Sequence, residues 1–230
     1  MSAGSLEEPA ISQLTETPQI KVWQGEFGRA YTDRNTLNPE QVDQLWCRNY
    51  GVSRSGINRE FLADVPKNAR ILEVGCNVGN QLLLLQEQGY RDLTAIEIQS
   101  YAIETARQRV VGALFRQASA LDIPFESGSF DLVFTSGVLI HIAPEDLKRA
   151  MFEIHRCARR YIWGAEYFSA EPASVQYRGH DQLLWKMDYA HLYLSTFPDL
   201  GLARERRLRY LENENIDTIF LLEKKLAGEA

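Results

Sequence analysis

The residues best suited to chemistry lie in the loop from Glu73 to Gly79 and at Glu97. Gly75 permits a tight turn and a close approach of backbone to a ligand, because it has no Cβ atom. Gly79 lets a helix begin beside the same ligand, whose anionic end meets free N–H groups. Glu97 follows Gly79 by 18 residues, and a carboxylate there accepts hydrogen bonds from both hydroxyls of a ribose. This combination predicts a nucleoside-binding site, although a solvated carboxylate at a strand end is the simpler alternative for Glu97 alone.

Other catalytic and metal-binding motifs are missing from the sequence. The glycine loop lacks the G-x-G-x-x-G pattern of dinucleotide-binding proteins and the Lys of a phosphate-binding loop. There is no G-x-S-x-G and no H-E-x-x-H motif. Cys47, Cys76 and Cys157 show no C-x-x-C spacing, so we expect neither a disulfide framework nor a metal site.

Two titratable side chains are candidates for catalysis at the ends of later strands. His141 follows an apolar run over 129–136, where a crevice should open, and Glu166 lies near the end of the next run. His141 either accepts a proton from, or orients, an acceptor hydroxyl, or it simply fixes the loop backbone. Glu166 either works at the same rim or pairs with a nearby arginine.

The segment over about 168–198 is the expected acceptor-binding region. Arg178 either binds a carboxylate or phosphate through its planar guanidinium, or pairs with Asp181 or Asp188. The candidate substrate contacts are Tyr167, Tyr177, Arg178, His180 and Trp185.

Alternating helical and strand patterns position these residues. We expect strands over 70–75, 93–98, 113–117, 129–136, 161–167, 203–211 and 217–223. Helices are expected over 80–88, 100–110 (capped by Ser100), 144–157 and 181–196. Strands that alternate with helices predict an α/β fold with a doubly wound, mostly parallel, seven-stranded sheet over 67–230.

The N-terminal part of the chain follows a helical pattern. Residues 1–18 are expected to be mobile, and residues 19–66 to form a helical lid in which Asn38 caps a helix. Trp23, Phe27 and Tyr31 are spaced to share one face of a helix, either as a docking face or as a cover for a ligand. Tyr31 and Arg34 are the expected polar contacts of the lid with a cofactor.

Composition limits the partners of this 230-residue chain. Its net charge of −6 and pI near 5.3 disfavour nucleic acid, because phosphate contacts need an excess of Lys and Arg. No apolar run reaches the roughly 18 residues of a membrane span, and the first residues lack the features of a signal peptide. We therefore expect a cytoplasmic protein with a small-molecule substrate and no membrane partner. Monomer and homodimer both remain open.

Four sequence blocks resemble the class I S-adenosylmethionine-dependent methyltransferases. The blocks are the glycine loop, Glu97, the segment from Ser119 to Phe125 and the segment from Ser129 to Phe134. The resemblance implies a Rossmann-like methyltransferase fold that binds S-adenosylmethionine and releases S-adenosylhomocysteine. It implies cofactor contacts at Glu73, Gly75, Asn77, Gly79, Glu97, Ile98, Ser119, Ala120, Leu121 and Gly137. Many relatives have Asp where Ser119 stands, and a serine hydroxyl there can still offer a hydrogen bond to the adenine amino group.

A narrower resemblance covers more of the chain. Residues 23–28, 137–142, 165–167, 177–180 and 184–186 are similar to methylases associated with pseudaminic acid biosynthesis. This resemblance implies a sugar-type or anionic acceptor that is methylated on oxygen or nitrogen. Methylation of RNA or protein, a non-catalytic S-adenosylmethionine-binding regulator and a nicotinamide dehydrogenase are the competing hypotheses. The sequence from Thr135 to Val138 lacks the Asn/Asp-Pro-Pro-aromatic tetrad of many nucleic-acid amino-group methylases.

Overall fold

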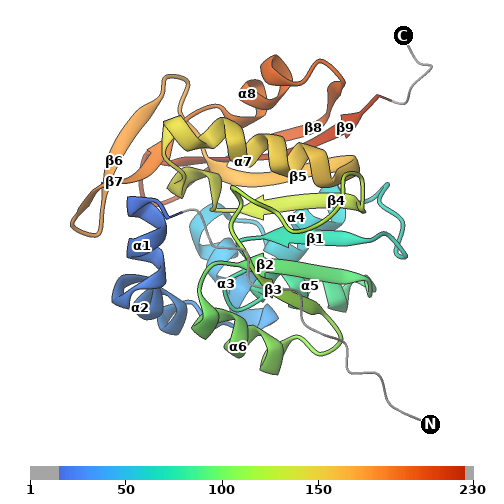
Figure 1. The fold of residues 1–230 in the computed structure, drawn as a ribbon, viewed down its shortest axis with the longest axis horizontal. Helices are drawn as coiled ribbons and strands as arrows, with labels where there is room; N and C mark the ends of the chain where they lie inside the picture. Colours follow the sequence, from blue (N-terminus) through green and yellow to red (C-terminus); the bar gives the residue numbers. More distant parts are fainter. Residues whose placement is uncertain (1–15, 226–230) are drawn as a thin grey trace.

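The computed structural model describes residues 16–225, in which helices cover both faces of a central sheet (Figure 1). The strands are β1 Ile71–Val74, β2 Leu93–Glu97, β3 Leu114–Gln117, β4 Phe130–Ser136, β5 Ala158–Tyr167, β6 Ala173–Tyr177, β7 His180–Lys186, β8 Leu200–Arg209 and β9 Ile216–Lys224. The helices are α1 Pro18–Gln24, α2 Glu26–Arg34, α3 Pro39–Tyr50, α4 Arg54–Phe61, α5 Asn80–Glu87, α6 Ser100–Arg109, the 3-10 helix η1 Leu139–His141, α7 Pro144–Cys157 and α8 Tyr189–Thr196.

The sheet has the strand order β3-β2-β1-β4-β5-β9-β8. Strands β1 to β5 pair in parallel, and β9 runs antiparallel to both of its neighbours. The predicted doubly wound, mostly parallel, seven-stranded sheet is therefore confirmed. The chain reverses its direction of winding between β1 and β4, which is the point where such sheets bind ligands.

Each face of the sheet buries its own apolar core. Helices α7 and α8 cover one face through residues such as Met151, Ile154 and Tyr193. Helices α4, α5 and α6 cover the other face, where Phe61 and Leu82 are among the most buried side chains. The inner strands β1, β2 and β4 are buried along almost their whole length because both faces are covered, as expected for a parallel sheet.

The N-terminal helices differ from the prediction in one respect. The expected single helix that carries Trp23 and Tyr31 is broken at Gly25, whose extended backbone separates α1 from α2. The predicted cap at Asn38 is confirmed, because its side chain accepts a hydrogen bond from Gln41 N at 2.9 Å. The Gln41 side chain in turn accepts one from Asn38 N. Most of the segment expected to be mobile lies outside the described residues.

The predicted helix over 181–196 is wrong in its first half. Residues 180–186 form β7, which pairs with β6 in a hairpin, and only the part from Tyr189 onward is helical. Arg178 and Gly179 both have positive φ angles, of 49° and 84°, which suits the tight turn of a two-residue hairpin. Asp188 caps α8 by accepting from His191 N, so the helix begins after it. A second correction concerns α6, where Gln99 rather than Ser100 is the N-cap residue.

Candidate functional site

The glycine loop joins β1 to α5 at the predicted position. Gly75 and Gly79 have φ angles of 74° and 75°, which side chains rarely adopt. A Cβ atom on Gly75 would lie 2.6 Å from a methyl carbon of Val138, and one on Gly79 would lie 2.7 Å from a methyl carbon of Val110. Both positions therefore need glycine, and Gly75 brings the loop close to the segment after β4.

Glu97 ends β2 and is 9% exposed. One carboxylate oxygen accepts from Asn77 N at 2.9 Å, and the other accepts from the backbone N of Ile98 and Gln99 at 2.8 and 3.1 Å. Burial raises the pKa of Glu97, whereas these three backbone N–H groups act in the opposite direction. The backbone thus fixes the carboxylate, and its remaining lone pairs can accept from a ligand.

A cavity of about 310 Å³ lies at the carboxyl ends of β1, β2 and β4. Of the residues predicted to bind a cofactor, those that line it are Tyr31, Glu73, Gly75, Asn77, Glu97, Ile98, Ser119, Ala120, Leu121 and Gly137. Gly79 and the exposed Arg34 are not among the lining residues. The fold therefore brings five separate segments of the sequence to one cavity, and it leaves Arg34 outside.

Two buried and oppositely charged side chains stand in the cavity wall. Arg54 on α4 is 1% exposed, and Glu73 on β1 is 3% exposed. Arg54 packs over Trp46 and Trp163, and its Nη1 has no hydrogen-bond partner among the described residues. The Oε2 atom of Glu73 is equally unpartnered. Burial lowers the pKa of Arg54 to about 10 and raises the pKa of Glu73. The charge of each side chain acts on the pKa of the other in the opposite direction, because it stabilises the charged form.

His141 in η1 also lines the cavity and is half-buried. Its Nδ1 lies 2.6 Å from the carbonyl oxygen of Leu183 in β7. Burial lowers the pKa of His141 to about 4, so the ring is neutral at pH 7. A neutral ring next to a carbonyl must carry its proton on Nδ1, and Nε2 then keeps a free lone pair.

Glu166 does not line the cavity, in contrast to its expected place at the rim beside His141. It is 1% exposed and lies beneath the turn after β4, where it accepts from Val138 N at 3.2 Å and Ile140 N at 3.4 Å. Burial raises the pKa of Glu166 to about 7. These contacts make Glu166 a support for the backbone that carries His141.

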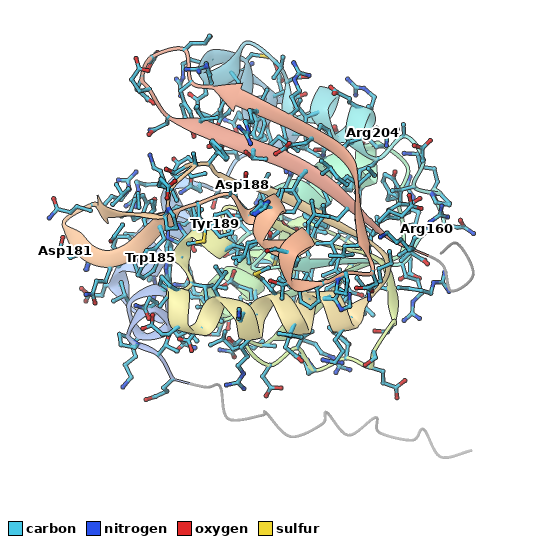
Figure 2. The ribbon with its side chains drawn as sticks, turned by 90° about the horizontal axis from the view of Figure 1, so that it is seen from above. Arg160, Asp181, Trp185, Asp188, Tyr189 and Arg204 are labelled. Carbon is cyan, nitrogen blue, oxygen red and sulfur yellow. The ribbon has the colours of Figure 1, made fainter. Side chains whose placement is uncertain are left out.

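The candidate substrate residues are spread over the hairpin and the end of β5, and the cavity wall contains none of them. Arg178 is exposed at the turn and stacks loosely on Tyr177. It does not form the ion pair to Asp181 or Asp188 that was the alternative to anion binding, and Asp188 pairs with Arg207 instead. Trp185 is 8% exposed and packs in the core. Figure 2 shows Asp181 near the projecting end of the hairpin and Trp185 nearer to the body of the protein.

Aromatic rings connect the N-terminal helices to the hairpin. The ring of Trp23 lies 4.6 Å from that of His141 and 5.2 Å from that of Tyr31, between centroids. Phe27 lies 4.9 Å from His180. Figure 1 shows α1 and α2 beside the β6–β7 hairpin, in agreement with these contacts. Helices α1 and α2 therefore cover one side of the cavity.

Sequence reasoning missed Arg54 and Gln99. The sequence carries a signal for Arg54, because Arg54, Ile57 and Phe61 share one helical face and an arginine on an apolar face is unusual. Gln99 follows Glu97 by two residues, and only the docked position of α2 reveals its contacts. Among residues 16–225 no cluster of three metal-ligating side chains occurs, and no helix is long and apolar enough to cross a membrane.

Comparisons with known proteins match the central part of the chain. A family model described as a methyltransferase domain matches residues 72–161. The tRNA (carboxymethyluridine(34)-5-O)-methyltransferase alkbh8 of Xenopus tropicalis is 29% identical over 116 residues, which cover 46% of this chain and 17% of that protein. The chain spans less than two thirds of the length of the curated relatives that it matches first, namely 17%, 58% and 45%.

Two crystal structures share the fold over nearly the whole chain. The 1,6-didemethyltoxoflavin-N1-methyltransferase of Burkholderia thailandensis, with bound S-adenosylhomocysteine, has a TM-score of 0.69 at 15% identity and covers 94% of this chain and 93% of that one. The magnesium protoporphyrin IX methyltransferase of Synechocystis, with bound S-adenosylmethionine, has a TM-score of 0.65 at 15% identity and covers 92% and 99%. Residues 72–161 thus match a methyltransferase domain, within a chain that has the Rossmann-like methyltransferase fold.

Proposed function

We propose that this protein transfers a methyl group from S-adenosylmethionine to an oxygen or nitrogen atom of a small metabolite. The observation that carries the proposal is the single cavity that Glu97, the glycine loop, Arg54 and Glu73 line together. Glu97 suits the ribose of the cofactor, and Arg54 and Glu73 suit the carboxylate and the ammonium of its amino-acid end. A nicotinamide cofactor carries no ammonium group that could pair with Glu73.

The cavity fits S-adenosylmethionine on three grounds. The apolar side chains of Ile98 and Leu121 lie near the backbone of Ser119 and Ala120, as a flat adenine ring requires. Glu97 would hold the ribose hydroxyls. The unpartnered atoms of Arg54 and Glu73 would meet the carboxylate and the ammonium of the amino-acid end. A buried polar atom without a hydrogen-bond partner is costly, so Arg54 Nη1 and Glu73 Oε2 both gain from a zwitterionic ligand.

The remaining residues of the site would position the methyl donor and the acceptor. When bound, S-adenosylmethionine supplies an already activated methyl group on its sulfonium. The protein must align donor and acceptor and exclude water, which is worth up to roughly 7–11 kcal/mol of the barrier. Trp23 and Tyr31 would exclude water from the lid side of the cavity. His141, neutral with Nε2 free, would accept a hydrogen bond from the acceptor group that is methylated.

The acceptor we propose is sugar-type or anionic. The resemblance to methylases associated with pseudaminic acid biosynthesis supports a sugar. Arg178, which forms no ion pair with a described residue, supports an anionic group near the hairpin, together with the neighbouring Tyr177. Tyr31, Tyr167 and Tyr177 lie within electrostatic range of one another, and their hydroxyls would donate to such a group.

Methylation of RNA is the second candidate, because one of the relatives is named a tRNA methyltransferase. The net charge of −6 weighs against it, since binding to RNA needs a surplus of cations. A non-catalytic role as an S-adenosylmethionine-binding regulator is the third.

Calorimetry with S-adenosylhomocysteine and transfer of a labelled methyl group test the proposal. Acceptors would include free sugars, nucleotide sugars, phosphorylated and carboxylated metabolites, and total RNA. Saturable binding and labelling of a small acceptor would support the proposal, whereas labelling of RNA alone would favour the second candidate. Binding without transfer to any acceptor would favour a regulator. Failure of S-adenosylhomocysteine to bind at saturating concentration would refute all three.

A further inference from the structure

A buried hydrogen-bonded ring connects the lid to the residues that hold Glu97. Thr32 on α2 is 1% exposed, and its hydroxyl donates to Gln99 Oε1 at 2.9 Å and accepts from Asn77 Nδ2 at 3.0 Å. Asn77 belongs to the glycine loop and Gln99 to the turn after β2. One lid hydroxyl therefore bonds to two of the loops that line the cavity.

The same two residues orient the Glu97 carboxylate through their backbones. Asn77 N donates to one carboxylate oxygen at 2.9 Å, and Gln99 N donates to the other at 3.1 Å. Each oxygen of Glu97 is thus linked to the Thr32 hydroxyl through a single intervening residue. Asn77 has a φ angle of 46°, which is unfavourable for a residue other than glycine, so its side-chain bonds help to hold this conformation.

Helix α2 packs closely against the Gln99 side chain and the end of α1. The Nε2 atom of Gln99 donates to the carbonyl oxygen of Trp23 at 2.9 Å, so the Gln99 side chain bonds to both α1 and α2. A Cβ atom on Gly28 would lie 2.6 Å from Gln99 Nε2 and 1.7 Å from Trp23 O. Helix α2 therefore docks here only because position 28 is glycine.

We propose that Thr32 is a positioning residue for ribose recognition, an inference that rests on the proposed function. With the lid docked, Thr32 fixes the side chains of Asn77 and Gln99, and their N–H groups aim both oxygens of Glu97 at the ribose hydroxyls. The coupling is reciprocal, so a ribose bound to Glu97 stabilises the docked lid. Ribose recognition is therefore shared between the sheet and the lid.

Calorimetry with two ligands tests Thr32 directly. The ligands are S-adenosylhomocysteine and its 2′-deoxy analogue, which lacks one hydroxyl that Glu97 would hold. Thr32→Val should weaken S-adenosylhomocysteine binding about tenfold, as expected for a lost buried hydrogen-bond partner, and should weaken binding of the analogue much less. Thr32→Ser keeps the hydroxyl and should restore the preference for ribose.

Thr105→Val is the matched control, because the Thr105 hydroxyl on α6 donates to the carbonyl oxygen of Tyr101 in the same helix. It should leave both affinities unchanged. Gly28→Ala is an independent variant that displaces Gln99, and it should reproduce the loss of preference. Hydrogen exchange adds a readout separate from affinity. S-adenosylhomocysteine should slow exchange in residues 18–34 more than the 2′-deoxy analogue does.

The outcomes separate this proposal from the proposed function. Equal weakening of both ligands by Thr32→Val, or no weakening, would overturn the positioning role and leave cofactor binding intact. If Thr32→Val does not fold, the same comparison with Gly28→Ala decides. If the unaltered protein does not bind S-adenosylhomocysteine, the proposed function fails, and this proposal fails with it.

Discussion

The Nδ1 atom of His141 lies 2.6 Å from the carbonyl oxygen of Leu183. The carbonyl belongs to β7 of the hairpin, whereas His141 belongs to the turn after β4, so the hairpin determines the tautomer of the ring. This contact leaves Nε2 as the free basic nitrogen of His141 in the cavity.

His141→Ala should lower turnover by more than threefold with the true acceptor, and by up to roughly 100-fold if the residue acts as a base. The contribution of His141 should be constant above pH 6, because its pKa is lowered to about 4. Steady-state kinetics between pH 5 and 9 checks both points. His191→Ala, an exposed histidine on α8, is the control. Turnover within threefold of the unaltered enzyme would exclude the catalytic role.

Arg54→Gln should reduce the preference of the protein for a ligand with an amino-acid end. The unaltered protein should bind S-adenosylhomocysteine more tightly than 5′-methylthioadenosine, which lacks the carboxylate and ammonium groups. The variant should lose at least tenfold of that preference, because a charged hydrogen bond contributes about 1.5–3 kcal/mol. Arg48→Gln, at an exposed position on α3, should keep it. An unchanged preference would show that Arg54 does not contact the ligand.

Glu97→Ala should bind S-adenosylhomocysteine at least tenfold more weakly. The variant loses two charge-assisted hydrogen bonds to the ribose, each worth about 1.5–3 kcal/mol. Calorimetry measures the loss, and Glu104→Ala on the exposed side of α6 provides the comparison. If both variants bind like the unaltered protein, Glu97 has no role in ribose recognition.

Asp217→Asn should make stability less dependent on pH. Burial raises the pKa of Asp217 from 3.8 to about 6, although Tyr50 donates to it at 2.6 Å. The folded protein therefore holds the proton more tightly than the unfolded chain, and this carboxyl reduces stability as the pH rises from about 4 to 6. Urea unfolding should show that Asp217→Asn gains stability relative to the unaltered protein between pH 4 and pH 7. A constant difference would contradict the raised pKa.

Gly164→Ala should destabilise the fold by about 1–3 kcal/mol through overpacking. Gly164 faces Phe220 across β5 and β9, and a Cβ atom would lie 2.1 Å from the ring carbon Cζ. Gly201 in β8 is the matched control, since its Cβ atom would have no neighbour closer than 3.8 Å. Thermal unfolding of the two variants should separate them clearly. Equal melting temperatures would mean that the Phe220 ring moves aside at little cost.

The hydrophobic pattern was sufficient to predict the parallel part of the fold. Strand β1 ends in a glycine loop, and α7 begins at Pro144, where both were expected. These elements follow local rules, because buried strands are continuous apolar runs and proline favours the first turn of a helix. The hairpin was missed because residues 180–186 contain no strict alternation, and packing against η1 decided their conformation.

The sequence alone determined the glycine loop, the acid at the end of β2 and therefore the class of ligand. The loop depends on backbone conformations that glycine readily adopts, and Glu97 ends a buried strand. Tertiary structure decided that Arg54 and Gln99 belong to the site and that Glu166 and Trp185 lie outside the cavity wall. The physical reason is that burial and hydrogen bonding between distant segments arise only when α2, α4 and the hairpin are docked. A local pattern, such as the apolar face that carries Arg54, does not show which segments meet.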